Sequence, residues 1–176
     1  MKSICKSLFI LTAAVFSAAV LPLGATECQV TAVASLPSGI HDMHAGVSGA
    51  FIGMSGNTLI VAGGSDFPGL KPWEGGLKKY YDTIYMLTAR DGKYECSISD
   101  VTFPVPAGGG CAASDGKTLY CFGGRNEAGP VNAVHAVGVT GGKVHVSQVS
   151  VLPEGFVPVS AVFYKGDGCI FVHGTV

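Results

Sequence analysis

Charged and aromatic side chains that could bind a ligand gather in two loops of the sequence, each directly after a pair of glycines. The first loop follows Gly63-Gly64 and the second follows Gly123-Gly124. Carboxylates can act as general acids or bases, and a lysine or arginine can hold an anionic group. Because function concentrates on long loops, we expect a ligand-binding site here, although solvated loop residues fit the same pattern. The candidates are Asp66, Trp73, Glu74, Lys78 and Lys79 in the first loop and Arg125 and Glu127 in the second.

Other chemical motifs are weak. No Cys-x-x-Cys pair or Cys/His cluster has the spacing of zinc ligands, and His41 and His44 lack a third ligand. Gly116-Lys117-Thr118 resembles the end of a phosphate-binding loop but lies in a predicted hairpin. The order of residues indicates no Ser-His-Asp set. We therefore expect no metal and no cofactor, and we assign no catalytic residue.

The composition indicates a turn-rich globular chain. Glycine contributes 26 of the 176 residues, about twice its average usage, without the three-residue period of collagen. A hydrophobic content of 48% argues against disorder. The net charge of −1 argues against a nucleic-acid partner, because nucleic-acid binders carry basic patches. We expect an all-β fold.

The first 25 residues have the features of a secretory signal peptide. Lys2 and Lys6 precede an apolar run over 8–23, and Ala25 is a suitable last residue before cleavage. The run is shorter than the roughly 20 residues that span a bilayer. We therefore expect a mature chain over 26–176 that is periplasmic or secreted and has no stable membrane anchor.

Five cysteines follow the predicted cleavage site, so at least one thiol is unpaired within the chain. Export would permit disulfides. A two-residue hairpin centred on Asp115-Gly116 would place Cys111 opposite Tyr120, and the sulfurs of Cys111 and Cys121 would then face opposite sides of the sheet. We predict no disulfide between these two cysteines.

An internal repeat determines the predicted architecture. Three segments, 46–64, 109–124 and 159–174, each contain two short apolar strands around a Gly-containing turn. In the first two units, two further strands follow, over 84–87 and 94–101 and over 134–137 and 144–151. The glycine pairs end the second strand of a unit, where crowded backbones and positive φ angles favour glycine. Four strands per roughly 50 residues predict a β-propeller blade, with a β-sandwich as the alternative.

The strand ending in Gly-Gly, the loop after it and the next strand with Tyr85 resemble kelch repeats. The resemblance is sharper over 46–64 and at Trp73-Glu74-Gly75-Gly76-Leu77-Lys78-Lys79. There the chain is similar to the N-acetylneuraminate epimerases, or sialic acid mutarotases, and above all to the group called cyclically permuted mutarotases. The similarity covers roughly residues 38–150.

This resemblance implies an incomplete kelch-type β-propeller of about two and a half four-stranded blades. The expected parts are an outer closing strand over 27–36, blades over 38–104 and 105–153, and a half blade over 154–176. Family members carry about six blades, so we expect a fragment whose open blade edges self-associate.

The resemblance also implies the interconversion of sialic acid anomers, with a small sugar as partner. That reaction needs one group to remove the anomeric proton, one to protonate the ring oxygen, and a cation for the substrate carboxylate. The family's acid/base Glu and its Arg partner match no position here, so we expect the catalytic blade to be missing. The alternative is a non-catalytic kelch module that binds glycan or protein. A copper oxidase on the same scaffold is disfavoured, because no Tyr/His/Cys ligand set is evident.

Overall fold

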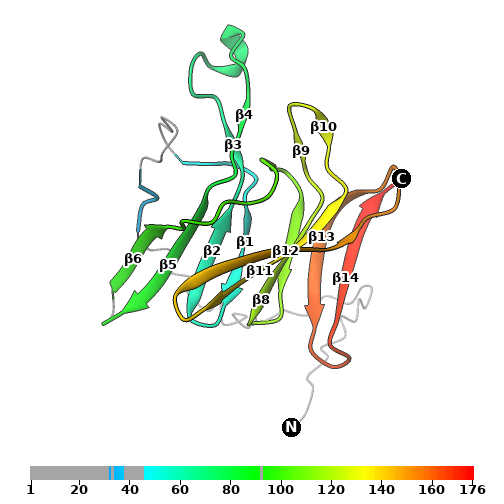
Figure 1. Ribbon diagram of the computed structural model, residues 1–176. Helices are drawn as coiled ribbons and strands as arrows, with labels where there is room; N and C mark the ends of the chain where they lie inside the picture. Colours follow the sequence, from blue (N-terminus) through cyan, green and yellow to red (C-terminus); the bar gives the residue numbers. More distant parts are fainter. Residues whose placement is uncertain (1–31, 33, 38–45, 92) are drawn as a thin grey trace, which may run out of the picture. The chain divides into compact units, whose positions relative to one another are not determined.

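Two four-stranded antiparallel sheets dominate the computed structural model, which describes residues 32, 34–37, 46–91 and 93–176 (Figure 1). The first sheet has the order β1-β2-β5-β6, with strands β1 (Phe51–Ser55), β2 (Thr58–Ala62), β5 (Ile84–Arg90) and β6 (Lys93–Ile98). The second sheet has the order β12-β11-β8-β7, with strands β7 (Cys111–Ser114), β8 (Thr118–Phe122), β11 (Ala133–Thr140) and β12 (Lys143–Val151). Within each sheet the strands follow one another as a meander.

A two-stranded hairpin of β13 (Val157–Tyr164) and β14 (Cys169–Thr175) follows the second sheet. The predicted all-β fold is therefore confirmed, with two four-stranded units and two strands of a third, and the described sheets do not close into a ring. The predicted signal peptide lies outside the described residues, as does most of the predicted strand over 27–36. Residues 32 and 34–36, which the structure describes, are not in a strand. In the described part of the chain, no helix has the length and apolar character needed to cross a membrane.

The second sheet is covered on both faces by the units next to it in the sequence. Strand β8 alternates its side chains between the two faces, as the period of a strand requires. Leu119 and Cys121 lie in a core cluster with residues of the first sheet such as Phe51, while Phe122 lies in a cluster with Ile170 of the hairpin. The first strands of the units also meet, because β7 contacts both β1 and β13. Such a succession of sheets is typical of propeller blades and differs from a two-layer sandwich.

The glycine pairs adopt the same backbone conformation in both sheets. The φ angles are 65° and 100° at Gly63 and Gly64, and 62° and 100° at Gly123 and Gly124. A Cβ atom on Gly63 would lie 2.4 Å from the carbonyl oxygen of Ala107. Positive φ and backbone crowding therefore both apply at Gly63, as the sequence predicted.

The predicted register of the β7–β8 hairpin is wrong by two residues. Cys111 pairs with Phe122 rather than Tyr120. The turn is longer than expected because Oδ1 of Asp115 accepts hydrogen bonds from the N–H groups of Lys117 and Thr118, both at 2.7 Å. A two-residue shift preserves the face of each side chain, so Cys111 and Cys121 still face opposite sides of the sheet and form no disulfide with each other.

Candidate functional site

Two hairpin arms project from one end of the sheets, and each begins directly after a glycine pair (Figure 1). The first arm, residues 65–80, pairs β3 (Ser65–Asp66) with β4 (Lys79–Tyr80) and carries a 3-10 helix, η1 (Pro72–Glu74), between them. The second arm, residues 125–130, pairs β9 (Arg125–Asn126) with β10 (Gly129–Pro130). The arms contain all the predicted binding residues. Because both arms project from the same end of the sheets, the fold places the two predicted loops at that end.

Glu127 joins the two arms. Its Oε1 atom accepts a hydrogen bond of 3.0 Å from the backbone N–H of Tyr80. This bond links a side chain of the second arm to the backbone of the first. The carboxylate of Glu127 therefore has a structural role in positioning the arms.

Glu74 also uses its carboxylate within the fold. Its Oε2 atom accepts a hydrogen bond of 3.0 Å from the backbone N–H of Lys71, just before η1. The helix ends at Gly75, whose φ of 85° is left-handed. Glu74 thus stabilises the turn at the tip of the first arm, a role that sequence spacing did not reveal.

The tip of the first arm is an exposed aromatic and cationic surface. Trp73 is 78% exposed, and η1 contains no buried residue. The Nζ atom of Lys71 lies 5.4 Å from the centroid of the Trp73 ring. The Nζ atom of Lys78 lies 5.4 Å from the centroid of the Tyr80 ring, and Lys79 makes a similar contact with Tyr81. Cation–π contacts therefore order these lysines along the arm while leaving the Trp73 side chain accessible.

Asp66 has a carboxylate oxygen that is buried and unused. Its Oδ1 atom accepts a hydrogen bond of 2.6 Å from the N–H of Phe67. Its Oδ2 atom is buried and receives no hydrogen bond from the described residues. A buried polar atom without a partner is costly in a folded protein, so Oδ2 is a candidate acceptor for a ligand hydroxyl.

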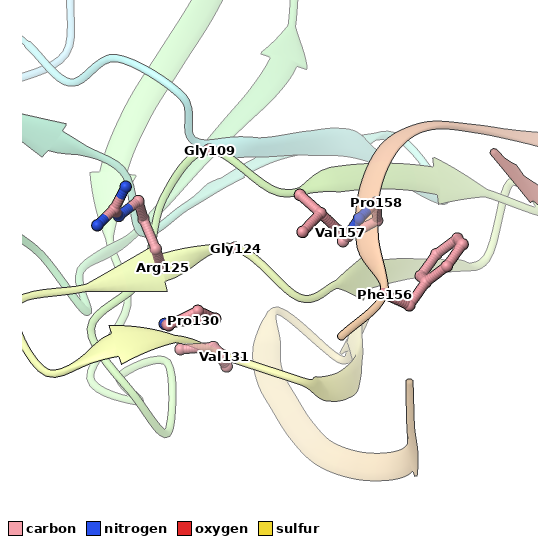
Figure 2. Close-up of a pocket in the computed structure, with 8 residues that line it drawn as sticks. All are labelled: Gly109, Gly124, Arg125, Pro130, Val131, Phe156, Val157 and Pro158. Carbon is pink, nitrogen blue, oxygen red and sulfur yellow. The ribbon is translucent and has the colours of Figure 1, made fainter. Parts of the chain in front are cut away.

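Arg125 stands at one side of a pocket of about 190 Å³ between the second sheet and the β13–β14 hairpin (Figure 2). Val157 and Pro158 lie on the opposite side of this pocket in the view shown. Arg125 is exposed, and none of the described acidic side chains forms an ion pair with it. Its guanidinium is therefore free to bind an anion. The full lining is Gly109, Gly124, Arg125, Pro130, Val131, Phe156, Val157 and Pro158.

The structure thus separates the predicted site residues by role. Glu74 and Glu127 bind backbone N–H groups, whereas the guanidinium of Arg125 forms no ion pair and one oxygen of Asp66 receives no hydrogen bond among the described residues. The sequence analysis did not identify the backbone of Gly109, Gly124 and Val131 as pocket lining. The described residues contain no group of three His, Cys, Asp or Glu side chains that could hold a metal ion. His41 and His44 lie outside the described residues.

Comparison with known proteins gives sequence relatives but no family model that matches. The N-acetylneuraminate epimerase of Salmonella enteritidis PT4 is 33% identical over 108 residues, which are 56% of this chain and 27% of that protein. The N-acetylneuraminate epimerase of Pasteurella multocida is 31% identical over 122 residues, which are 62% of this chain and 31% of that protein. The chain therefore spans less than a third of the length of these curated relatives.

A solved structure described as "Structure of YjhT" is also similar, with 27% identity and a TM-score of 0.49 over 59% of this chain and 31% of that one. The resemblance to N-acetylneuraminate epimerases that the sequence predicted is confirmed by the curated relatives.

Proposed function

We propose that this chain carries a sugar-binding part of a sialic acid mutarotase, a protein that interconverts the anomers of N-acetylneuraminate. The observation that carries the proposal is the identity of 31–33% to proteins named N-acetylneuraminate epimerase. The two arms and the free guanidinium of Arg125 support it, because they offer groups that suit a small anionic sugar.

Mutarotation opens and recloses the sugar ring at the anomeric carbon. One group removes the proton of the anomeric hydroxyl while the bond from the anomeric carbon to the ring oxygen breaks, and another group gives a proton to the ring oxygen. Reclosure on the other face of the carbonyl produces the other anomer. The reaction consumes no cofactor in this scheme.

Binding roles follow from which side chains are free. Arg125 holds the substrate carboxylate, ideally through two parallel hydrogen bonds. Asp66 accepts a hydrogen bond from a sugar hydroxyl through Oδ2. Trp73 and Lys78 contact the sugar from the first arm. Glu74 and Glu127 hold the arms in place rather than moving protons.

The proton transfers are assigned to the complete propeller. The chain spans less than a third of the length of the curated relatives, and its described residues provide one free carboxylate oxygen, Oδ2 of Asp66. In this proposal the chain binds the substrate, and other blades contribute the acid/base pair.

A non-catalytic module that binds glycan is the second candidate. The observation that favours it is the use of the Glu74 and Glu127 carboxylates in backbone hydrogen bonds, which leaves few groups for acid/base chemistry. The two candidates make the same prediction for binding and different predictions for the rate of anomer exchange.

Nuclear magnetic resonance tests both. Saturation transfer from the protein to N-acetylneuraminate measures binding, and two-dimensional exchange spectra measure the interconversion of its anomers. For the protein extended by the remaining blades, binding with faster exchange than in buffer supports the mutarotase, and binding without acceleration supports the glycan-binding module. The absence of both effects contradicts the proposal.

Export is part of the same proposal. Residues 1–25 act as a signal peptide, and the mature protein is periplasmic or secreted. Mass spectrometry of the protein recovered from the expressing cells should give the mass of residues 26–176. Recovery of the uncleaved chain alone would contradict export.

A further inference from the structure

Backbone hydrogen bonds fill the junction between the first and second sheets. The N–H of Gly64 donates to the carbonyl oxygen of Ala107 at 2.7 Å, and the N–H of Ala107 donates to the carbonyl oxygen of Tyr81 at 3.3 Å. Nearby, the N–H of Gly109 donates to the carbonyl oxygen of Gly49 at 2.8 Å. Ala107 therefore occupies the junction with both of its backbone polar groups satisfied.

Two hydrogen bonds beside the first junction recur beside the junction between the second sheet and the β13–β14 hairpin. The bond from the N–H of Tyr81 to the oxygen of Gly64, 2.9 Å long, recurs between Val131 and Gly124 at 2.9 Å. The 2.7 Å bond between Phe103 and Asp82 recurs, also at 2.7 Å, between Leu152 and Asn132. Counting from Phe103 and Leu152, Phe156 is the equivalent of Ala107, and Pro158 is the equivalent of Gly109.

The three hydrogen bonds that the N–H groups of Gly64, Ala107 and Gly109 donate in the first junction have no equivalents in this second junction. Pro158 has no N–H to donate, and the N–H of Phe156 donates instead to the carbonyl oxygen of Pro153 at 3.1 Å. In the described structure the N–H of Gly124 and the carbonyl oxygens of Val131 and Gly109 therefore have no hydrogen-bond partner. The ring of Phe156 points away from Gly124 in Figure 2.

The pocket beside Arg125 lies where these bonds are missing, and its lining contains Gly109, Gly124, Val131, Phe156 and Pro158. The unused N–H of Gly124 and the unused carbonyl oxygens of Val131 and Gly109 belong to residues that line this pocket. A secondary amide would satisfy both groups, because it supplies an acceptor oxygen and a donor N–H. Val157 and Pro158 supply apolar surface for a methyl group.

We infer that this pocket is a subsite for the acetamido group of an N-acetylated acidic sugar. The N–H of Gly124 donates to the acyl oxygen, the carbonyl oxygen of Val131 accepts the amide N–H, and the methyl group packs against Val157 and Pro158. The inference rests on the proposed function, because Arg125, which follows Gly124 in the chain, is assigned to the carboxylate of the same sugar.

The size of the pocket agrees with this assignment. Its volume of about 190 Å³ is enough for an acetamido group and one edge of a sugar ring. A second pocket of about 300 Å³ shares Pro130, Val131, Phe156 and Val157 with it. The two pockets together give the rest of the sugar ring space beside the subsite.

Titration with two acidic sugars tests the inference on the unmodified chain. The probes are N-acetylneuraminate and its deaminated analogue, in which a hydroxyl replaces the acetamido group. We expect the analogue to bind about tenfold more weakly, because it loses two backbone hydrogen bonds and the methyl contact. The backbone amide signal of Gly124 should shift with N-acetylneuraminate, and N-methylacetamide alone should shift the same signal.

A triple variant provides a second test. E154V/G155P/F156A copies Val105-Pro106-Ala107 of the first junction into the second. We expect the new alanine to close the pocket, so that the two sugars bind with equal affinity. The amide spectrum reports whether this variant is folded.

The outcomes separate the inference from the proposed function. Equal affinity of the unmodified chain for both sugars, with the Gly124 signal unmoved, overturns the acetamide subsite and leaves acidic-sugar binding intact. Failure of both acidic sugars to bind overturns the proposed function. In that case a shift of Gly124 by N-methylacetamide still supports the subsite, and no shift overturns it.

Discussion

Ser55 and Val139 are joined by a hydrogen bond although 84 residues separate them in the sequence: the backbone N–H of Val139 donates to Oγ of Ser55 at 2.8 Å. The same hydroxyl donates to the carbonyl oxygen of Lys117 at 2.5 Å. Ser55 is 3% exposed and ends strand β1 of the first sheet, whereas Val139 lies in β11 of the second sheet and Lys117 lies in the turn between β7 and β8. This buried hydroxyl therefore helps to hold the two sheets together at the end opposite the glycine pairs, together with the hydrogen bond of 2.8 Å from the N–H of Gly56 to the carbonyl oxygen of Gly116.

Removal of this hydroxyl should weaken the packing of the two sheets. S55A leaves one N–H and one carbonyl oxygen without their partner, and we expect it to lower the free energy of unfolding by about 2 kcal/mol. The control is S114A, because Oγ of Ser114 makes an exposed hydrogen bond of 2.5 Å to the carbonyl oxygen of Met54. Urea denaturation compares the two variants, and an equal loss in both would contradict the role given to Ser55.

Substitutions at two glycines separate backbone conformation from crowding. Gly56 and Gly63 have φ angles of 59° and 65°, but a Cβ on Gly56 meets nothing within 4 Å, whereas one on Gly63 meets the oxygen of Ala107 at 2.4 Å. G56A should cost about 1 kcal/mol from the left-handed conformation alone. G63A should cost at least twice as much in the same denaturation experiment. Similar costs would show that crowding is not the reason for the glycine pair.

Stability should fall in mild acid because of His135. This side chain is 2% exposed, and its ring lies edge-on to Phe103 with the centroids 4.8 Å apart. Burial lowers the pKa of His135 in the folded state. As the pH falls, the unfolded chain therefore takes up the proton before the folded chain does. The contribution of neutral His135 to the free energy of unfolding is complete above about pH 6.5 and is lost as the pH falls toward the lower pKa of the folded state.

The variant H135F isolates this effect. Phenylalanine keeps an aromatic ring against Phe103 and has no proton to gain. The difference in unfolding free energy between the wild type and H135F should change between pH 7.5 and pH 5.5, with the wild type losing more. Parallel pH profiles for the two proteins would contradict the assignment.

The open hairpin should lead to self-association of this chain. Val162, Tyr164 and Phe171 of β13 and β14 are 61%, 53% and 58% exposed, and β14 pairs with β13 alone among the described strands. We expect a second copy of the chain to cover this hairpin, as an open strand edge favours. V162K should shift the protein toward monomer in light scattering, whereas Y94K on β6 should not. A monomeric unmodified chain would contradict this expectation.

The architecture could be predicted from the sequence because it depends on local signals that repeat. Paired glycines and alternating apolar residues recur in each unit. They determine the order of the strands and the side of the sheet to which each side chain points, independently of distant contacts. The register of β7 and β8 could not be predicted, since it depends on how the carboxylate of Asp115 bonds to the turn. The register was therefore wrong because the sequence did not determine the type of turn between the two strands.

The site was predictable only as a set of loops. The sequence placed Asp66, Glu74, Arg125 and Glu127 after the glycine pairs, but it could not show that Glu127 reaches the N–H of Tyr80. Such a contact depends on how two arms are packed in space. The pocket beside Gly124 was also missed, because the sequence repeat aligns Val159 with Gly109, and only the register shift between Pro158 and Ser160 places Pro158 at that position.

The proposed function depends above all on the contact between Arg125 and the carboxylate of N-acetylneuraminate. Calorimetric titration with this sugar and with its methyl ester, for the wild type and R125A, tests it most directly. The control is R90A, because Arg90 lies in an exposed pair with Glu95, 3.7 Å apart, on the β5–β6 hairpin. We predict that R125A weakens binding of the acid at least tenfold, because a charge-assisted contact is lost, and that R90A leaves it unchanged. Equal affinities of the wild type and R125A for the acid would contradict the account.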